Sequence, residues 1–99
     1  MYSQTDYYFD RFIKSKNKKK KYTAVLVHRS TGRKVHVHFG GIRANGVPYE
    51  QYRDNVMGLY SKYNHEDKER RRRWLKRHAK DGFKPFSASY FARRYLWSL

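Results

Sequence analysis

The residue types best suited to chemistry are concentrated between positions 68 and 80. This stretch holds eight Lys or Arg side chains against a single Glu. If it forms a helix, one side carries only basic residues, namely Arg72, Arg73, Lys76 and Lys80. A guanidinium group presents a planar fork of donors and a permanent charge, and both suit phosphate oxygens. We predict that this side of the helix binds anions; the alternative is a solvated helix face without a partner.

A second basic run places six lysines in the eight positions from 14 to 21. Mutual repulsion and the lack of apolar residues predict an extended linker or loop here. Such a run serves either as a solubilising tether or as an electrostatic clamp on phosphates or on an acidic neighbour. In the second case, the predicted anion contacts are Lys18, Lys19, Lys20 and Lys21.

The other side of the predicted helix gathers polar groups around its apolar anchors. His65, Asp67, Arg71, Trp74 and His78 fall on one stripe at helical spacing. A catalytic cluster has the same appearance in a sequence, but a small aromatic core needs satisfied polar anchors. We therefore interpret the stripe as a structural polar cluster that fixes the helix to the other elements. Within it, Arg71 is expected to pair with Asp67 one turn earlier.

The pair His36 and His38 has the spacing of metal ligands on one face of a strand. A metal site, such as that of a ββα nuclease, would need further ligands from His28, His65, His78 or Asp67. The pair lies next to Lys34 in a strongly positive chain, whose field repels cations. No carboxylate pair or nucleophile–base set accompanies it. We expect no metal, no cofactor and no catalytic residue.

Composition restricts the class of protein further. The chain has 99 residues, a net charge of +16 and no cysteine. It lacks an apolar run long enough for a membrane span, so none is expected. The charge indicates a polyanion, a membrane surface or an acidic protein as partner. Aromatic residues make up 18% of the chain and branched aliphatics are few, so the rings are needed for the core rather than for stacking on bases.

Two strands and two helices are predicted to position these groups. Residues 22–28 and 34–39 favour an antiparallel β-hairpin with a turn at Gly32. Asn64 is predicted to cap a helix that ends near residue 81, with Gly82 in the left-handed conformation. Ser87 is predicted to cap a last amphipathic helix. The expected fold class is α+β, a small single domain in which a β-hairpin is packed by two C-terminal helices.

The first 21 residues are predicted to form an aromatic and basic N-terminal arm, outside the domain of residues 22–99. Tyr8, Phe9 and Phe12 have a spacing that places them on one side of a short helix. A helix this short is marginal by itself. The arm therefore needs a surface to pack on, either its own domain or a partner.

From His38 onward, the chain carries short motifs in a characteristic order. They are His38-Phe39-Gly40, Tyr60-x-x-Tyr63-Asn64-His65-Glu66-Asp67, Arg70-Arg71, Arg77-His78 and Leu96-Trp97. With these motifs the chain resembles an uncharacterised family of small basic proteins of large nucleocytoplasmic DNA viruses. Asn64 stands where the family usually has Thr, and both residues cap helices. The resemblance implies a viral protein of the virion or the infected host cell, and it implies no activity.

These observations favour a non-enzymatic protein that binds nucleic-acid phosphates without sequence preference. Its role would be that of an accessory in genome packaging or condensation. No sequence-reading motif is present, which leaves direct readout of bases unsupported. The alternative is a minor capsid or cement protein whose basic segments contact acidic capsid proteins. Both roles require positive charge, so the sequence does not separate them.

Overall fold

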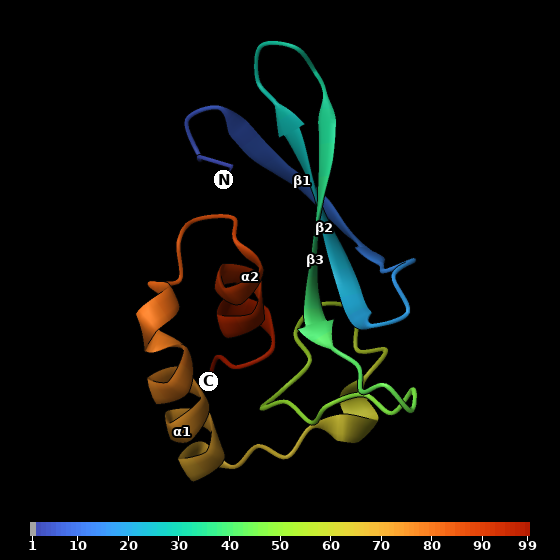
Figure 1. The fold of residues 1–99 in the computed structure, drawn as a ribbon, viewed down its shortest axis with the longest axis vertical. Coiled ribbons are helices and arrows are strands. Elements are labelled where there is room, and N and C mark those ends of the chain that lie inside the picture. The colour runs from blue at the N-terminus through green and yellow to red at the C-terminus, as the bar shows by residue number, and fades with distance from the viewer. Residues whose placement is uncertain (1) are drawn as a thin grey trace.

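The computed structural model describes residues 2–99 and places a three-stranded antiparallel sheet beside two helices (Figure 1). The strands are β1 (Tyr7–Lys14), β2 (Lys20–His28) and β3 (Lys34–Gly41). They are followed by α1 (Lys68–His78) and α2 (Ala88–Tyr95), with the short 3-10 helices η1 (Ser61–Tyr63) and η2 (Ala79–Asp81). The α+β class, with both helices near the C-terminus, is confirmed. Within residues 2–99, no helix has the length and apolar character needed to cross a membrane.

The N-terminal segment is a strand, so the prediction of a short helix there was wrong. β1 pairs antiparallel with β2, and the predicted boundary after residue 21 falls inside β2. A bulge between Phe9 and Arg11 inserts Asp10 into β1. Because of this extra residue, Phe9 and Phe12 both face the helices, although strict alternation would place them on opposite faces. Their spacing of three therefore imitates a helix in the sequence.

The predicted hairpin and most of the predicted helix ends are present. β2 and β3 pair antiparallel, and Gly32 in the connecting turn has a positive φ of 72°. α1 is continued by η2 and ends at Gly82 in the left-handed conformation, and the Ser87 side chain caps α2. The start of α1 differs from the prediction. Asp67, and not Asn64, accepts hydrogen bonds from the first free N–H groups of the helix.

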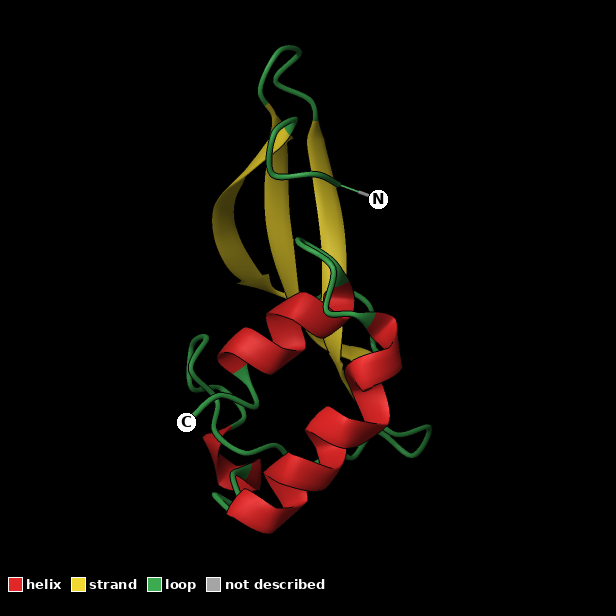
Figure 2. Cartoon of the chain, turned by 90° about the vertical axis from the view of Figure 1, so that its left-hand side faces the viewer, coloured by secondary structure: helices red, strands yellow, loops and turns green. Residues whose placement is uncertain are grey.

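The core consists mainly of aromatic rings on the side of the sheet that faces the helices. Phe91 of α2 lies at its centre, with ring-centroid distances of 5.5 Å to Phe39 and 5.9 Å to both Phe12 and Phe86. α2 is the helix that packs against β3. Figure 2 shows that the helices cover only one part of the sheet, beyond which the strands extend. Few aliphatic residues are thus enough, because each ring buries a large area.

The long connection between β3 and α1 is held by buried polar groups. The hydroxyl of Tyr22 donates to Asp54 Oδ2 at 2.7 Å, and the Tyr60 N–H donates to the same oxygen at 2.9 Å. The side chain of Gln51 donates to the Tyr60 carbonyl and to Asn64 Oδ1. Asn64 thus fixes the connection, which explains why it does not cap α1.

Phe12→Ala tests whether β1 belongs to the folded core. Its ring contacts Phe39, Phe91 and Tyr95, so we expect the free energy of unfolding to fall by about 3 kcal/mol. Tyr8→Ala is the matched control, because Tyr8 lies on the opposite face of β1 and is 42% exposed. Chemical denaturation measures both variants. Equal stability of the two variants would contradict the packing of β1 on the helices.

Candidate anion-binding cleft

α1 is attached to the rest of the chain through Trp97, which follows α2. The indole rings of Trp74 and Trp97 stack with centroids 4.9 Å apart and planes 7° from parallel. Arg71 Nε donates to the Trp97 carbonyl at 2.6 Å. Since α2 and not α1 packs on β3, a cleft of about 660 Å³ remains between α1, α2 and the end of the sheet.

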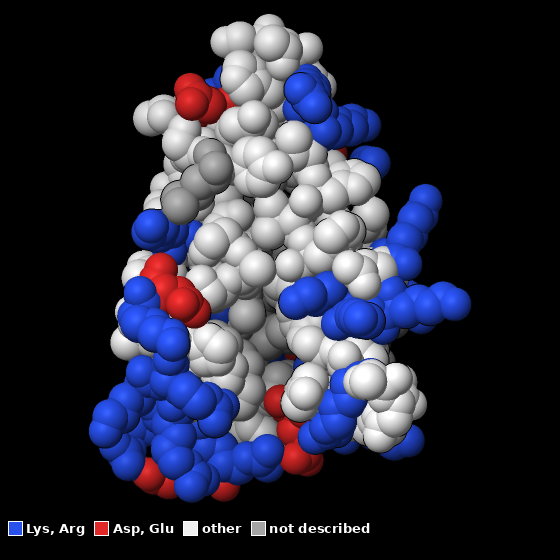
Figure 3. Space-filling view, viewed as in Figure 1, with Lys and Arg blue, Asp and Glu red and all other residues white. Residues whose placement is uncertain are grey.

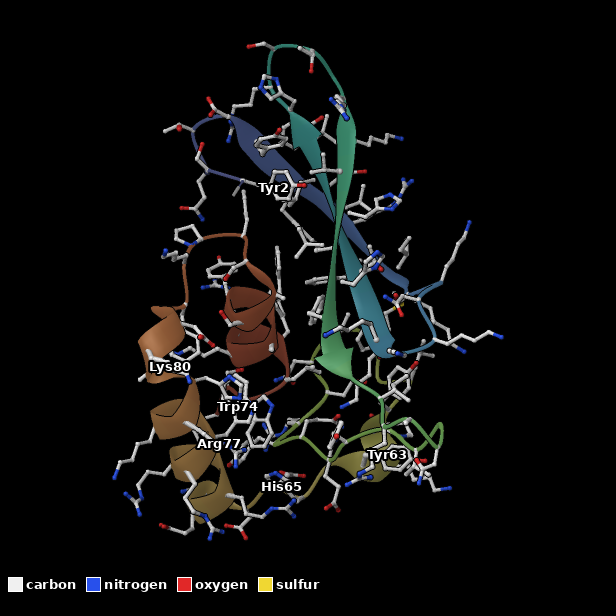
Figure 4. The ribbon with its side chains drawn as sticks, in the orientation of Figure 1. Tyr2, Tyr63, His65, Trp74, Arg77 and Lys80 are labelled. Carbon is white, nitrogen blue, oxygen red and sulfur yellow. The ribbon has the colours of Figure 1, made fainter. Side chains whose placement is uncertain are left out.

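One wall of the cleft is formed by α1. Arg70, Arg73 and Arg77 follow one another at spacings of three and four, so they lie on one stripe of the helix. Figure 4 shows Trp74 and Arg77 projecting from α1 toward the rest of the chain. This stripe differs from the one formed by Arg72, Lys76 and Lys80, which does not line the cleft. The basic residues of α1 thus point in two directions.

The opposite wall comes from the start of β2 and the connection after β3. It includes Lys20, Arg43, Tyr49 and Glu50. The guanidinium of Arg43 lies 4.6 Å above the ring of Tyr49, a cation–π contact. The chain folds closely behind this wall. A Cβ atom at Gly40, whose φ is +79°, would lie 3.0 Å from Lys21 Cβ and 3.1 Å from Leu96 Cδ1.

The cleft is strongly positive. Six basic residues line it against one acidic residue, Glu50. The side chain of Arg70 donates to Glu50 at 3.0 Å, and this contact holds the pKa of that carboxyl below its usual value. Within residues 2–99, no carboxylate lies within 4.0 Å of the Arg43, Arg73 or Arg77 guanidinium. Figure 3 shows basic side chains crowded over α1 and a second group of them on the opposite side of this view.

Lys21 is the buried cation of the cleft, with only 2% of its surface exposed. Its Nζ donates to the Tyr49 carbonyl at 2.5 Å and to Gln51 Oε1 at 2.6 Å. Burial lowers the pKa of Lys21 from 10.5 to about 8. Lys21 therefore links β2 to the connection after β3, which forms this wall, and it also adds a positive charge.

The residues predicted to bind anions are divided by the fold. Lys20, Lys21 and Arg73 line the cleft. Arg72 lies outside it and pairs with Glu69, whereas Lys76, Lys80, Lys18 and Lys19 are exposed elsewhere. Sequence reasoning missed Arg43, Arg70 and Arg77. Arg77 lies one turn after Arg73, so helical spacing would have found it, but no local signal connects Arg43 to α1.

Four residues of the predicted polar cluster, namely His65, Arg71, Trp74 and His78, contact Trp97 or each other, whereas the Asp67 side chain caps α1. The ring of His65 lies 5.2 Å from that of Trp97, and its Nδ1 accepts from the Asp67 N–H. His78 packs on Trp74 at 4.4 Å. The predicted pairing of Arg71 with the Asp67 side chain is not present, because Asp67 caps α1 and Arg71 donates to Trp97.

The histidine pair on β3 is not part of a larger ligand set. The rings of His36 and His38 are 6.4 Å apart, and His38 Nδ1 lies 2.6 Å from Thr23 Oγ1. Across residues 2–99, no group of three His, Cys, Asp or Glu side chains is placed to hold a metal. The expectation that the chain holds no metal stays a prediction.

The chain matches no protein-family model, no curated protein and no solved structure. The resemblance to a viral family is therefore still an expectation from the motifs alone.

The buried amine of Lys21 predicts a pH dependence of stability. The folded chain loses this proton near pH 8, whereas the unfolded chain keeps it until about 10.5. The free energy of unfolding should therefore rise with pH above about 8, by at most ~1.4 kcal/mol per unit. Burial also raises the pKa of Tyr22, which would lower stability above the usual tyrosine pKa of 10.0. The measurement therefore stops below that pH. Denaturation from about pH 7 to about pH 9.5 measures the slope. Lys21→Met should abolish it and Lys19→Met should keep it; an unchanged slope in Lys21→Met contradicts the assignment.

Arg71→Met tests the anchoring of α1. It removes a charged donor from a part-buried carbonyl and should lower the free energy of unfolding by about 1.5–3 kcal/mol. Arg72→Met is the matched control. It removes a solvent-exposed ion pair with Glu69 and should have a much smaller effect. Thermal melts compare the two, and equal losses would show that the Arg71 contact does not anchor α1.

Proposed function

We propose that the chain is a non-enzymatic protein that binds nucleic-acid phosphates electrostatically and without sequence preference. The observation that carries this proposal is the uncompensated charge of α1 and the cleft beside it. Arg73 and Arg77 have no carboxylate within 4.0 Å in residues 2–99, in a chain that has 24 Lys or Arg against only 8 Asp or Glu. A polyanion would supply the missing counter-charge.

A chain of phosphates fits this surface better than a single compact anion does. The two basic stripes of α1 extend over about two to three helical turns, so several separate charges can be met at once. Guanidinium groups bind phosphate oxygens through paired donors. Contacts to phosphates carry no sequence information, so binding would depend on charge and salt rather than on bases.

The viral context is part of the same proposal. As an accessory of genome packaging or condensation, the protein would act in the infected host cell and be carried in the virion. Support for this context comes from the motifs between His38 and Trp97 only. A cement protein in the capsid would use the same charges on acidic protein surfaces, and salt-dependent binding to DNA separates the two roles.

Arg73→Gln combined with Lys76→Gln tests the proposal. With four to six phosphate contacts, log K for duplex DNA should fall against log salt with a slope of roughly −4 to −5. The double variant should reduce the size of that slope by about 2, because two contacts are lost. Glutamine preserves helix propensity, so the fold should be kept. Fluorescence anisotropy titrations at several salt concentrations give the slope.

The matched control is Arg33→Gln combined with Lys34→Gln. It removes the same net charge from the exposed turn at the other end of the sheet, away from α1 (Figure 1). We expect its salt slope to equal that of the unchanged chain. If both double variants lose affinity equally, only net charge matters. If neither changes DNA binding while particle assembly fails, the partner is a capsid protein.

A further inference from the structure

We propose that the cleft between α1 and the end of the sheet binds one unpaired nucleic-acid strand in preference to duplex. This inference rests on the proposed function and names the form of nucleic acid that this function favours. The strand would lie with its phosphates between the arginines of α1 and the cations of the opposite wall. Its bases would lie against the apolar and aromatic surfaces inside the cleft.

Cations face the cleft from two sides. Arg73 and Arg77 belong to α1, whereas Lys20 and Arg43 belong to the sheet end and the connection that follows it. A single strand can enter between two such walls and meet both of them. The phosphates of a duplex lie on its outside, so a duplex can contact α1 from outside, where Arg73 and Lys76 are both exposed, but cannot enter the cleft.

The size and the lining of the cleft suit a nucleotide better than a lone phosphate. Its volume of about 660 Å³ lies within the range of sites that enclose small organic ligands, about 300–1,000 Å³. On the α2 side the lining residues are small, namely Ala88, Ser89 and Ala92. Deeper in the cleft lie Phe39, Trp74 and Leu96. A simple phosphate site needs no such space or apolar lining, whereas a nucleotide needs both.

The rim of the cleft carries a flat surface formed by Tyr49 and Arg43. Tyr49 is 51% exposed, and its ring is covered by the Arg43 guanidinium at 4.6 Å. Guanidinium planes and aromatic rings are the two kinds of surface on which unpaired bases stack. The contact of Lys21 with the Tyr49 carbonyl holds this residue in place. The rim thus offers stacking next to charge, which is the combination found in proteins that bind single strands.

An acidic peptide is the main competing ligand, because carboxylates would also be attracted to these cations. The lining favours the strand, since carboxylate side chains would leave the apolar interior of the cleft unfilled. Nucleotides carry a charge and a planar ring in every repeat, and the lining offers both cations, such as Arg43, and an exposed aromatic ring, that of Tyr49.

The experiment compares a short oligo-dT strand with a DNA duplex of equal length in the full chain, at one salt concentration. We expect the single strand to bind more tightly by about tenfold, equivalent to one stacked base. Ala88→Phe fills the cleft and should remove most of this preference. Ala79→Phe is the matched control, because Ala79 is exposed on η2 and does not line the cleft. It should bind both probes as the unchanged chain does.

Arg43→Gln decides the question independently if Ala88→Phe fails to fold. Arg43 is exposed, and its loss should weaken the single strand much more than the duplex. Equal binding of the two probes, or an unchanged preference in the folded cleft variants, would overturn this inference and leave the proposed function standing. Failure of both probes to bind would instead refute the proposed function. Displacement of oligo-dT by a poly-glutamate peptide at equal charge would also overturn the inference, in favour of an acidic peptide.

Discussion

The stacking of Trp74 on Trp97 is the interaction on which the rest of the site depends. α1 is dense in positive charge, and its repulsion with the other basic segments opposes close packing. Two nearly parallel indoles and the hydrogen bond from Arg71 to the Trp97 carbonyl supply the opposing attraction. Trp97 lies just after α2 and not in the sheet. Its contact with Trp74 therefore holds α1 beside α2 and away from β3. The cleft is thus a consequence of where the contacts of α1 with Trp97 lie.

The opposite wall depends on buried polar groups rather than on a larger apolar core. Asp54 and Gln51 are buried residues of the connection after β3, and they bond to Tyr22, Lys21 and backbone groups. A satisfied buried network specifies one conformation, because each alternative leaves a polar group without a partner. The protein has few aliphatic residues to fix so long a connection by packing. The same network that orders the connection therefore also places Tyr49 and its neighbours at the rim of the cleft.

Sequence reasoning succeeded where the signals are local. The strands of the β2–β3 hairpin, the Ser87 cap and the left-handed Gly82 each depend on a few adjacent residues. It failed at β1, where the Asp10 bulge gives a strand the spacing of a helix. It also failed to assemble the cleft, since Arg43 approaches α1 only through the tertiary fold. The positive charge of α1 was evident from the sequence, but the division of its arginines into two directions depends on which side Trp74 buries.

The pair formed by Arg70 and Glu50 links the two walls of the cleft. Glu50 is the one acidic residue in the lining, and it is engaged by the arginine nearest the start of α1. An acidic residue placed deeper would have cancelled Arg73 or Arg77 and reduced the attraction for phosphate. The pair instead connects α1 to the opposite wall, and Arg43, Arg73 and Arg77 have no carboxylate within 4.0 Å in residues 2–99. The arrangement keeps like charges on facing walls at a fixed separation, so the electrostatic work of bringing them together is done in folding and not during binding.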